Sequence, residues 1–93
     1  MVTALILINV ERGQVNAVAE RLTEIPGISE VYSIAGRWDL VAILRVREPD
    51  QLAEVVTAEL LKVGGIVETE TLIAFRAYSK HDLEAAFSLG FKR

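Results

Sequence analysis

Four consecutive residues, Gly36-Arg37-Trp38-Asp39, gather more chemistry than any other stretch of this chain. They place a glycine, a cation, the only tryptophan and a carboxylate between two apolar runs, 31–35 and 40–44. Turns between strands are usually built from little more than Asn, Gly and Asp. A glycine leaves its backbone N–H open, a carboxylate receives an ammonium group, and an indole ring covers an apolar side chain. These groups suit the binding of a small zwitterion such as an amino acid.

Each of these residues also has a structural interpretation. An aspartate often caps its own turn, as Asp39 would here. Trp38 is equally explained by packing in a contact between subunits. Arg37 is explained by a solvated or inter-subunit ion pair. Gly36 forms the turn in either interpretation.

Two other groupings contain titratable side chains. Glu68 and Glu70 lie on one side of a predicted strand, about 7 Å apart, but no sugar-stacking aromatic or histidine lies near them in the sequence. We interpret them as a solvated or ion-paired face. His81 lies between Ser79 and Asp82 without a strained nucleophile turn, so we interpret it as a polar residue of a helix's first turn. No catalytic residue is predicted, and the protein is not expected to be an enzyme.

The composition excludes further classes of site. The chain has 93 residues, which predicts one domain, and it has no cysteine and one histidine. Disulfides, thiolate nucleophiles and thiolate zinc sites are therefore excluded, and an ordinary histidine metal site is not expected. The net charge of −3 and the scattered Lys and Arg argue against direct binding of nucleic acid. We predict no metal and no cofactor.

Hydrophobic residues make up 52% of the chain, more than the core of so small a domain absorbs. Self-association is expected, because it would bury the hydrophobic residues that the core does not absorb. No run approaches the roughly 18 apolar residues of a membrane span. The first apolar run lacks the basic leader and cleavage site of a secretory signal. We expect a cytoplasmic protein without a membrane partner.

Hydrophobic periodicity predicts the elements that position the 36–39 turn. Period-two alternation predicts strands over 2–10, 28–35, 40–46 and 66–77. Helical spacing predicts helices over 14–24 and from Pro49 to Val63. The first helix is ended by Pro26-Gly27 and the second by Gly64-Gly65.

The two halves of the chain resemble each other at an offset of 38 residues. The matched pairs include Ala4 with Ala42, Ile6 with Leu44, Leu22 with Leu60, Gly27 with Gly65 and Ile28 with Ile66. This repeat predicts an α+β, ferredoxin-like βαββαβ fold with an antiparallel four-stranded sheet. Right-handed crossovers place both helices on one face. The other, apolar face is then predicted to pack on a second copy, because exposed patches of that kind are usually contact surfaces.

The C-terminal residues form a separate predicted segment. Residues 79–82 resemble a capping box before a short helix that reaches about Leu89. We therefore divide the chain into a domain over 1–78 and a helical extension over 79–93. Exposed Phe87 and Phe91 would be costly in water, so the extension is expected to pack on its own domain or on a neighbouring protomer.

Two short motifs resemble the effector-binding domain of the Lrp/AsnC regulator family, also called the regulation-of-amino-acid-metabolism (RAM) domain. The first is the Gly-x-aromatic-Asp pattern at 36–39, followed by an apolar strand. The second is Gly-[Val/Ile]-x-x-Thr-x-Thr, matched by 65–71. The Ile-Pro-Gly-Ile entry into the second strand, at 25–28, also fits. The resemblance spans roughly Leu5 to Ala77.

The resemblance implies a dimer of facing sheets, an α/β-barrel type assembly that often forms tetramers or octamers. Amino-acid effectors would bind at crevices between dimers. The implied ligand-binding residues are those of the tip and two threonines of the fourth strand: Gly36, Arg37, Trp38, Asp39, Thr69 and Thr71. The chain starts directly at the first strand, without the helix-turn-helix domain of full-length members. It therefore resembles a stand-alone effector domain, which is expected either to sense an amino acid by itself or to join full-length regulators of this family in mixed oligomers and alter their response.

Two alternatives remain open on sequence. Related dimeric ferredoxin-like barrels include cofactor-free monooxygenases and isomerases, which need a proton-transfer group in a pocket; Tyr32, Tyr78 and His81 are the aromatic or imidazole candidates. The other is an ACT-type regulatory module. Its ligand would lie near the first strand-to-helix turn, residues 11–14.

Overall fold

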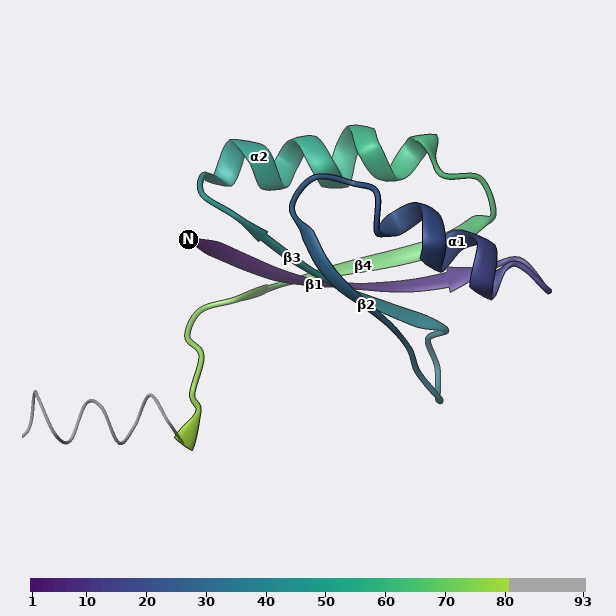
Figure 1. Cartoon of the computed structure of the whole chain (residues 1–93), viewed down its shortest axis with the longest axis horizontal. Coiled ribbons are helices and arrows are strands. Elements are labelled where there is room, and N and C mark those ends of the chain that lie inside the picture. The colour runs from purple at the N-terminus through teal and green to yellow at the C-terminus, as the bar shows by residue number, and fades with distance from the viewer. Residues whose placement is uncertain (81–93) are drawn as a thin grey trace, which may run out of the picture.

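The computed structural model describes residues 1–80 as one four-stranded antiparallel sheet with two helical segments on one face (Figure 1). The strands are β1 (Val2–Val10), β2 (Ile28–Ser33), β3 (Leu40–Val46) and β4 (Ile66–Ala74). Helix α1 (Val15–Leu22) joins β1 to β2, and α2 (Pro49–Glu54) follows β3. The second helical segment continues as a π-helical turn, η1 (Val55–Glu59), and ends in a 3₁₀ turn, η2 (Leu60–Lys62). Within residues 1–80, no helix is long and apolar enough to cross a membrane.

This architecture confirms the predicted ferredoxin-like order βαββαβ and the α+β class. The bounds of β1 and β3 agree with the prediction, whereas β4 ends at Ala74 instead of residue 77. It ends there because Ala74 pairs with Thr3, near the beginning of its only partner strand. The predicted helical extension over 79–93 lies almost entirely outside the described residues.

The widening of the second helix coincides with three consecutive β-branched residues, 55–57. Branching at Cβ crowds the preceding turn of a helix and restricts χ1. The Thr57 hydroxyl also donates to the carbonyl of Ala53 at 2.6 Å, a local bond that competes with the helical pattern. The segment still covers the sheet, because Leu52, Val55 and Leu60 remain buried.

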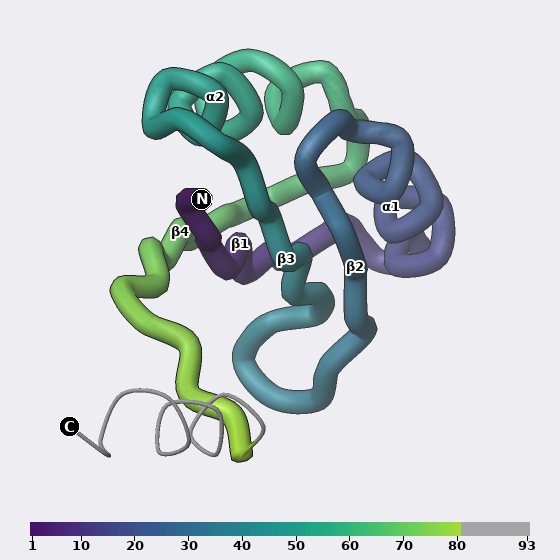
Figure 2. Tube along the Cα trace, turned by 60° about the vertical axis from the view of Figure 1, so that its left-hand side comes forward, coloured from purple at the N-terminus to yellow at the C-terminus, as the bar shows by residue number. Residues whose placement is uncertain are grey.

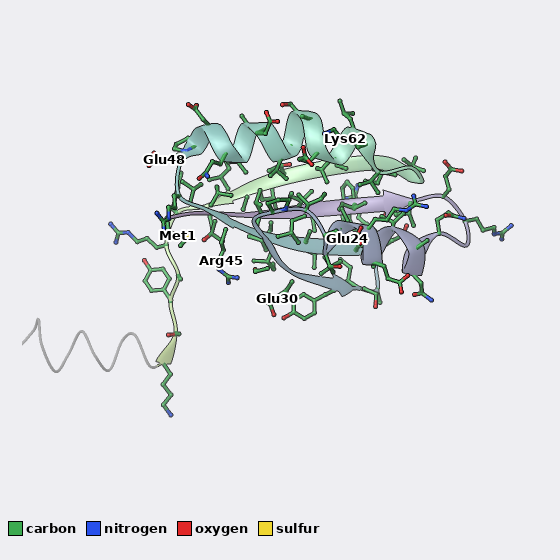
Figure 3. All side chains as sticks on the ribbon, turned by 45° about the horizontal axis from the view of Figure 1, so that its top comes forward. Met1, Glu24, Glu30, Arg45, Glu48 and Lys62 are labelled. Atoms are coloured by element: carbon green, nitrogen blue, oxygen red, sulfur yellow. The ribbon has the colours of Figure 1, made fainter. Side chains whose placement is uncertain are left out.

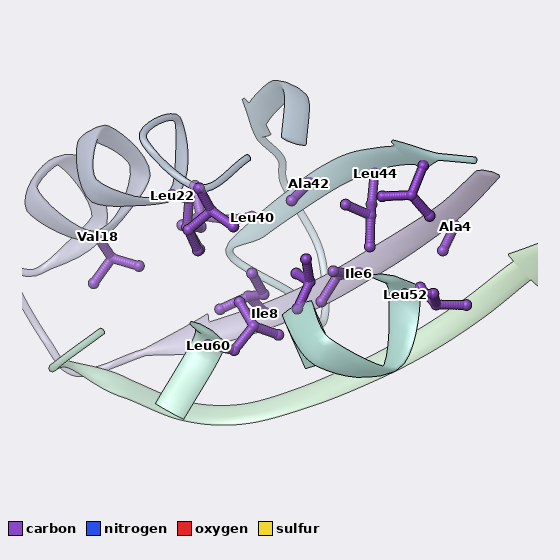
Figure 4. Close-up of a cluster of buried hydrophobic side chains, with 13 residues drawn as sticks. Ala4, Ile6, Ile8, Val18, Leu22, Leu40, Ala42, Leu44, Leu52 and Leu60 are labelled. Atoms are coloured by element: carbon purple, nitrogen blue, oxygen red, sulfur yellow. The ribbon is translucent and has the colours of Figure 1, made fainter. Parts of the chain in front are cut away.

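The core lies between the helices and the two central strands. The strand order is β2-β3-β1-β4, so β1 and β3 are central and pair from Val2 with Val46 to Ile8 with Leu40. Alternate residues of these strands are buried against α1 and α2 (Figure 4): Ala4, Ile6, Ile8, Leu40, Ala42, Leu44 and Val46. Fully burying one such aliphatic side chain contributes about 1.5–3 kcal/mol. No polar side chain of the described residues is buried.

Within residues 1–80, no helix covers the opposite face of the sheet. The pairings place Leu5, Leu7, Val41, Ile43 and Leu72 together on this bare face. Tyr32 joins them opposite Val41 and is 50% exposed, and Leu72 is 45% exposed. Figure 3 shows Arg45 and Glu30 on this side, away from α2. Their side chains form an exposed pair with Nη1 and Oε1 3.9 Å apart.

Two glycines make equivalent joints between helix and strand, as the 38-residue repeat predicts. Gly27 has φ +98° and Gly65 has φ +95°, values that side chains disfavour. Space is limiting as well at Gly27, where an added Cβ would lie 2.9 Å from both Leu44 Cδ1 and Val46 Cγ1. The Gly27 carbonyl accepts from the Arg45 N–H at 2.8 Å, and the Gly65 carbonyl accepts from the Glu11 N–H at 2.8 Å. Each joint thus ties the helix-to-strand connection of one repeat to the first strand of the other repeat, at Arg45 within β3 or at Glu11 directly after β1.

We predict that Gly27→Ala lowers the free energy of unfolding by about 2–4 kcal/mol, because backbone strain and overpacking add at this joint. The matched control is Gly13→Ala. Gly13 has φ +80° but open space where its Cβ would lie, so about 1–2 kcal/mol of strain alone is expected. Urea unfolding of both variants measures the difference. Equal losses would show that the contact with Leu44 and Val46 carries no weight.

Candidate functional site

The tip, which we define as residues 34–39, links β2 to β3. Figure 2 shows this connection looping away from both helices. Gly36 has φ +132°, and nothing lies within 4 Å of where its Cβ would be. The turn therefore needs glycine for its backbone angle, not for space. The exposed backbone of Gly36 is consequently open to a molecule approaching the tip.

Asp39 holds the tip against the end of β1. Its Oδ2 accepts a hydrogen bond from the Val10 N–H at 2.9 Å. In return, the Asp39 N–H donates to Asn9 Oδ1 at 3.0 Å and to the Ile8 carbonyl at 3.0 Å. We call this reciprocal pair of side-chain bonds the Asn9–Asp39 clasp. The Asp39 carbonyl also accepts from the Ile34 N–H at 3.0 Å, which closes the base of the turn.

The clasp changes the structural interpretation of Asp39. A cap on its own turn was the alternative to a ligand contact, but the side chain instead satisfies a backbone N–H of the neighbouring strand. Val10 lies beyond Ile8, the last β1 residue that pairs with β3. Its N–H, which is partly buried, would otherwise lack a partner at the end of the β1–β3 ladder. One carboxylate oxygen of Asp39 thus takes the place of a strand-to-strand hydrogen bond at Val10.

Asn9 was not among the predicted site residues. Its position in a strand of alternating character marks it only as part of the face opposite the core, together with Leu5 and Leu7. An isolated polar residue on such a face has many possible roles, so the sequence carries no specific signal for the clasp. Only the pairing of β1 with β3 brings Asn9 to Asp39, 30 residues away.

The other tip side chains are accessible. Trp38 is half-buried, and Arg37 is exposed. The ion pairs found among residues 1–80 join Arg45 to Glu30 and Lys62 to Glu59, and neither includes Arg37. Asp39, also half-buried, places its carboxylate next to Trp38 in the chain. A carboxylate, an indole ring and an open cation therefore occupy one turn.

The two threonines do not meet the tip within one copy. Thr69 pairs with Ile8, and Thr71 pairs with Ile6, so both face the helical side of the sheet. Because β1 lies between β3 and β4, two strand spacings, about 10 Å, separate Thr69 from the base of the tip. Thr69 is exposed and Thr71 is half-buried. A ligand held by the tip of one copy does not bridge to these threonines of the same copy by short contacts.

The two described candidates for proton transfer, Tyr32 and Tyr78, are exposed and do not belong to the core. Tyr32 lies on the bare face and donates a hydrogen bond to Glu30, whose carboxylate raises the pKa of the tyrosine above its usual value. Tyr78 is 73% exposed, and His81 lies outside the described residues. The space between helices and sheet is filled by apolar side chains. Among residues 1–80, no cluster of His, Cys, Asp or Glu could hold a metal.

The larger hollow of the described domain lies away from the tip. It measures about 440 Å³ and is bounded by Pro26-Gly27, the C-terminal end of β3 and one side of the α2–η1 segment. The tip precedes the first residue of β3, whereas this hollow adjoins Val46, its last residue. The turn at 11–14, where the ACT-type alternative would place a ligand, does not line this hollow, and it begins directly after Val10, which the tip contacts through Asp39. That turn is tied to Gly65 through Glu11.

Comparison of the sequence with known proteins assigns the chain to a family. The sequence model of the Lrp/AsnC ligand binding domain matches residues 3–83. An uncharacterized HTH-type transcriptional regulator of Pyrococcus abyssi is 36% identical over 58 residues, which cover 62% of this chain and 39% of the regulator. The match thus spans well under half the length of such curated relatives.

Solved structures agree with this match. The crystal structure of a protein from Thermus thermophilus superposes with a TM-score of 0.79 at 44% identity, covering 86% of this chain and 100% of that one. A feast or famine regulatory protein of M. tuberculosis, solved as a complex with L-methionine, superposes with a TM-score of 0.71. Its identity is 22%, with 86% of this chain and 54% of that chain covered, so it shows likeness of fold alone.

We predict that Asp39→Ala lowers the free energy of unfolding by about 1–3 kcal/mol, because the Val10 N–H loses its acceptor. Asp39→Asn keeps a side-chain oxygen at the same position and is expected to lose less than half as much. Thermal and urea unfolding of the two variants measure the difference. If both variants lose the same stability, the hydrogen bond is not what Asp39 contributes.

Proposed function

The chain belongs to the Lrp/AsnC ligand binding domain family, and on that premise we propose that it senses a small amino acid through the tip. Curated relatives are named as HTH-type transcriptional regulators. The proposed role is therefore regulatory: the domain binds an effector and passes on its presence through assembly, without chemical conversion. The observation that carries the proposal is the fixed carboxylate of Asp39 in the same turn as Trp38 and an open glycine backbone.

The chemistry of the tip supports an amino acid as the ligand. A carboxylate accepts charge-assisted hydrogen bonds from an ammonium group. The indole of Trp38 offers an apolar surface for the ligand's side chain. The open backbone of Gly36 and the guanidinium of Arg37 are donors for the ligand's carboxylate. A protein of the same fold is known as a complex with L-methionine, which agrees with this class of ligand.

The site is proposed to be complete only where copies meet. The tip projects from the sheet (Figure 2), and its residues line neither the hollow beside Pro26-Gly27 nor the one beside Phe75, whereas most small-molecule sites are concave and bury most of the ligand. Thr69 and Thr71 face the other side of the sheet, so in this proposal they contribute to a crevice from a second copy. We therefore propose that tips and threonines of neighbouring dimers form the crevice together.

The dimer itself is proposed to form through the bare face. Five aliphatic side chains and Tyr32 lie there in register, and the helices of residues 1–80 cover the opposite face. Burying such a patch would supply the hydrophobic contact that a small domain lacks. Full-length regulators of the same family are the proposed further partners, through mixed assemblies. Nucleic acid is not a proposed ligand of this domain, given its net charge of −3.

We predict that Leu7→Lys on the bare face lowers the molecular mass in solution by at least half, because it places a charge in the proposed interface. The control is Leu61→Lys. Leu61 is 81% exposed and lies on η2, in the helical layer. Analytical ultracentrifugation of both variants and of the unchanged chain measures the mass. A monomeric unchanged chain, or an unchanged mass for Leu7→Lys, would refute the sheet-to-sheet dimer.

We predict that calorimetry with the twenty amino acids detects at least one ligand at millimolar concentration or below. Asp39→Asn should weaken that binding at least tenfold, because it removes the charge that meets the ammonium group while keeping an acceptor for Val10. Asp50→Asn, in the exposed first turn of α2, is the charge-matched control. Silence from all twenty amino acids would overturn the proposed function.

A further inference from the structure

We infer that Asn9 is a positioning residue for the tip: its side-chain oxygen fixes the peptide plane that carries both Trp38 and Asp39. This inference rests on the proposed function of the tip and adds a residue to it. Asn9 would not touch the ligand. It would set where the ring and the carboxylate of the tip stand when the ligand arrives.

The argument begins with the atom that Asn9 binds. The Asp39 N–H belongs to the peptide unit whose carbonyl comes from Trp38, and this N–H lies 3.0 Å from Asn9 Oδ1. Peptide units are planar, so holding the N–H also constrains the Trp38 carbonyl on the other side of the bond. One side-chain acceptor thus restrains the backbone on which both functional side chains are mounted.

Asn9 and Asp39 also restrain each other. The Asp39 carboxylate in turn accepts a hydrogen bond from the N–H of Val10, the residue after Asn9. The two hydrogen bonds run in opposite directions between the same pair of chain segments. The Ile8 carbonyl shares the Asp39 N–H at 3.0 Å, but it is backbone and cannot be changed by substitution. Asn9 is therefore the part of the clasp that can be altered without touching the tip.

A local irregularity in the pairing of β1 with β4 accompanies the clasp, and its extra residue, Val67, lies on β4. Asn9 pairs with Glu68, but Val10 pairs with Ile66, so the β1–β4 register shifts between these two residues. A β-bulge bends a strand and re-aims its side chains, and bulges are frequent beside functional sites. The shift falls at Asn9 and Val10, two of the three β1 residues that form hydrogen bonds with Asp39. The register shift and the clasp thus lie side by side at the end of β1.

The neutral amide suits this position. An aspartate at 9 would still offer an oxygen to the Asp39 N–H, but it would add a carboxylate beside Asp39 and opposite Glu68. A leucine has nearly the same shape as asparagine and no acceptor. Asn9→Leu therefore removes the hydrogen bond with little change in volume, and Asn9→Asp preserves the acceptor. Asn16→Leu, on the exposed side of α1, is the matched control.

The only tryptophan of the chain provides a readout that does not need the ligand. Trp38 adjoins the restrained peptide, so acrylamide quenching of its fluorescence reports the freedom of the tip. We expect Asn9→Leu to raise the quenching constant of Trp38 and to weaken amino-acid binding about three- to tenfold. Asn9→Asp, which keeps the acceptor but adds the repulsion of a carboxylate beside Asp39, should raise the quenching constant less than Asn9→Leu does. Asn16→Leu should change neither quantity.

The outcomes separate this inference from the proposed function. If the unchanged chain binds no amino acid, the proposed function fails, and the positioning role fails with it. If the unchanged chain binds but Asn9→Leu alters neither affinity nor quenching, the positioning role alone is refuted. Should Asn9→Leu not fold, as judged by circular dichroism, Asn9→Ser replaces it, because a serine hydroxyl is too short to keep the 3.0 Å contact. Retained affinity and quenching in Asn9→Ser would then overturn the inference.

Discussion

The structure depends on one constraint: both helical crossovers cover the same face of a four-stranded sheet. Right-handed connections impose this arrangement on two consecutive βαβ units. The central strands β1 and β3 therefore bury one set of alternate residues completely and leave the other set open. The open set is apolar at its centre, and it ends in polar residues beside the tip. Within residues 1–80, one face of the sheet is thus packed against the helices, and the other face remains uncovered.

Nearly the whole core can be predicted from the hydrophobic periodicity of the sequence. Alternation in 2–10 and 40–46 reflects burial on one face only, and these strands have the predicted bounds. The 38-residue repeat extends to the backbone conformation, since Gly27 and Gly65 adopt nearly the same φ. The end of β4 was predicted less well because a strand ends where its partner ends, and Thr3 is a partner that composition does not reveal.

The sequence predicts which functional groups lie in the candidate site, but not which residues hold them in place. The unusual residue types of the 36–39 turn stand out in the sequence without any structure. The partner of Asp39 does not, because Val10 and Asn9 reach it only through the register of β1 against β3. The same limit applies to Thr69: a motif names it, but the strand order puts β1 between it and the tip. Residue types indicate the chemistry of a candidate site, whereas strand order determines which of its residues lie together in one copy.

The position of the proposed site also bears on how a ligand could act. A ligand enclosed by one copy stabilises that copy, but it shifts an assembly only if its affinity differs between the assembled and the separate state. Under the proposed function, a separate copy would offer little affinity, since Trp38 and Asp39 are only half-buried there. Contacts from a second copy would supply the remainder, so binding and association would be linked by the same free energy in both directions. A rigid tip strengthens that linkage, because a turn that is already ordered by the Asn9–Asp39 clasp loses less entropy when the second copy and the ligand arrive.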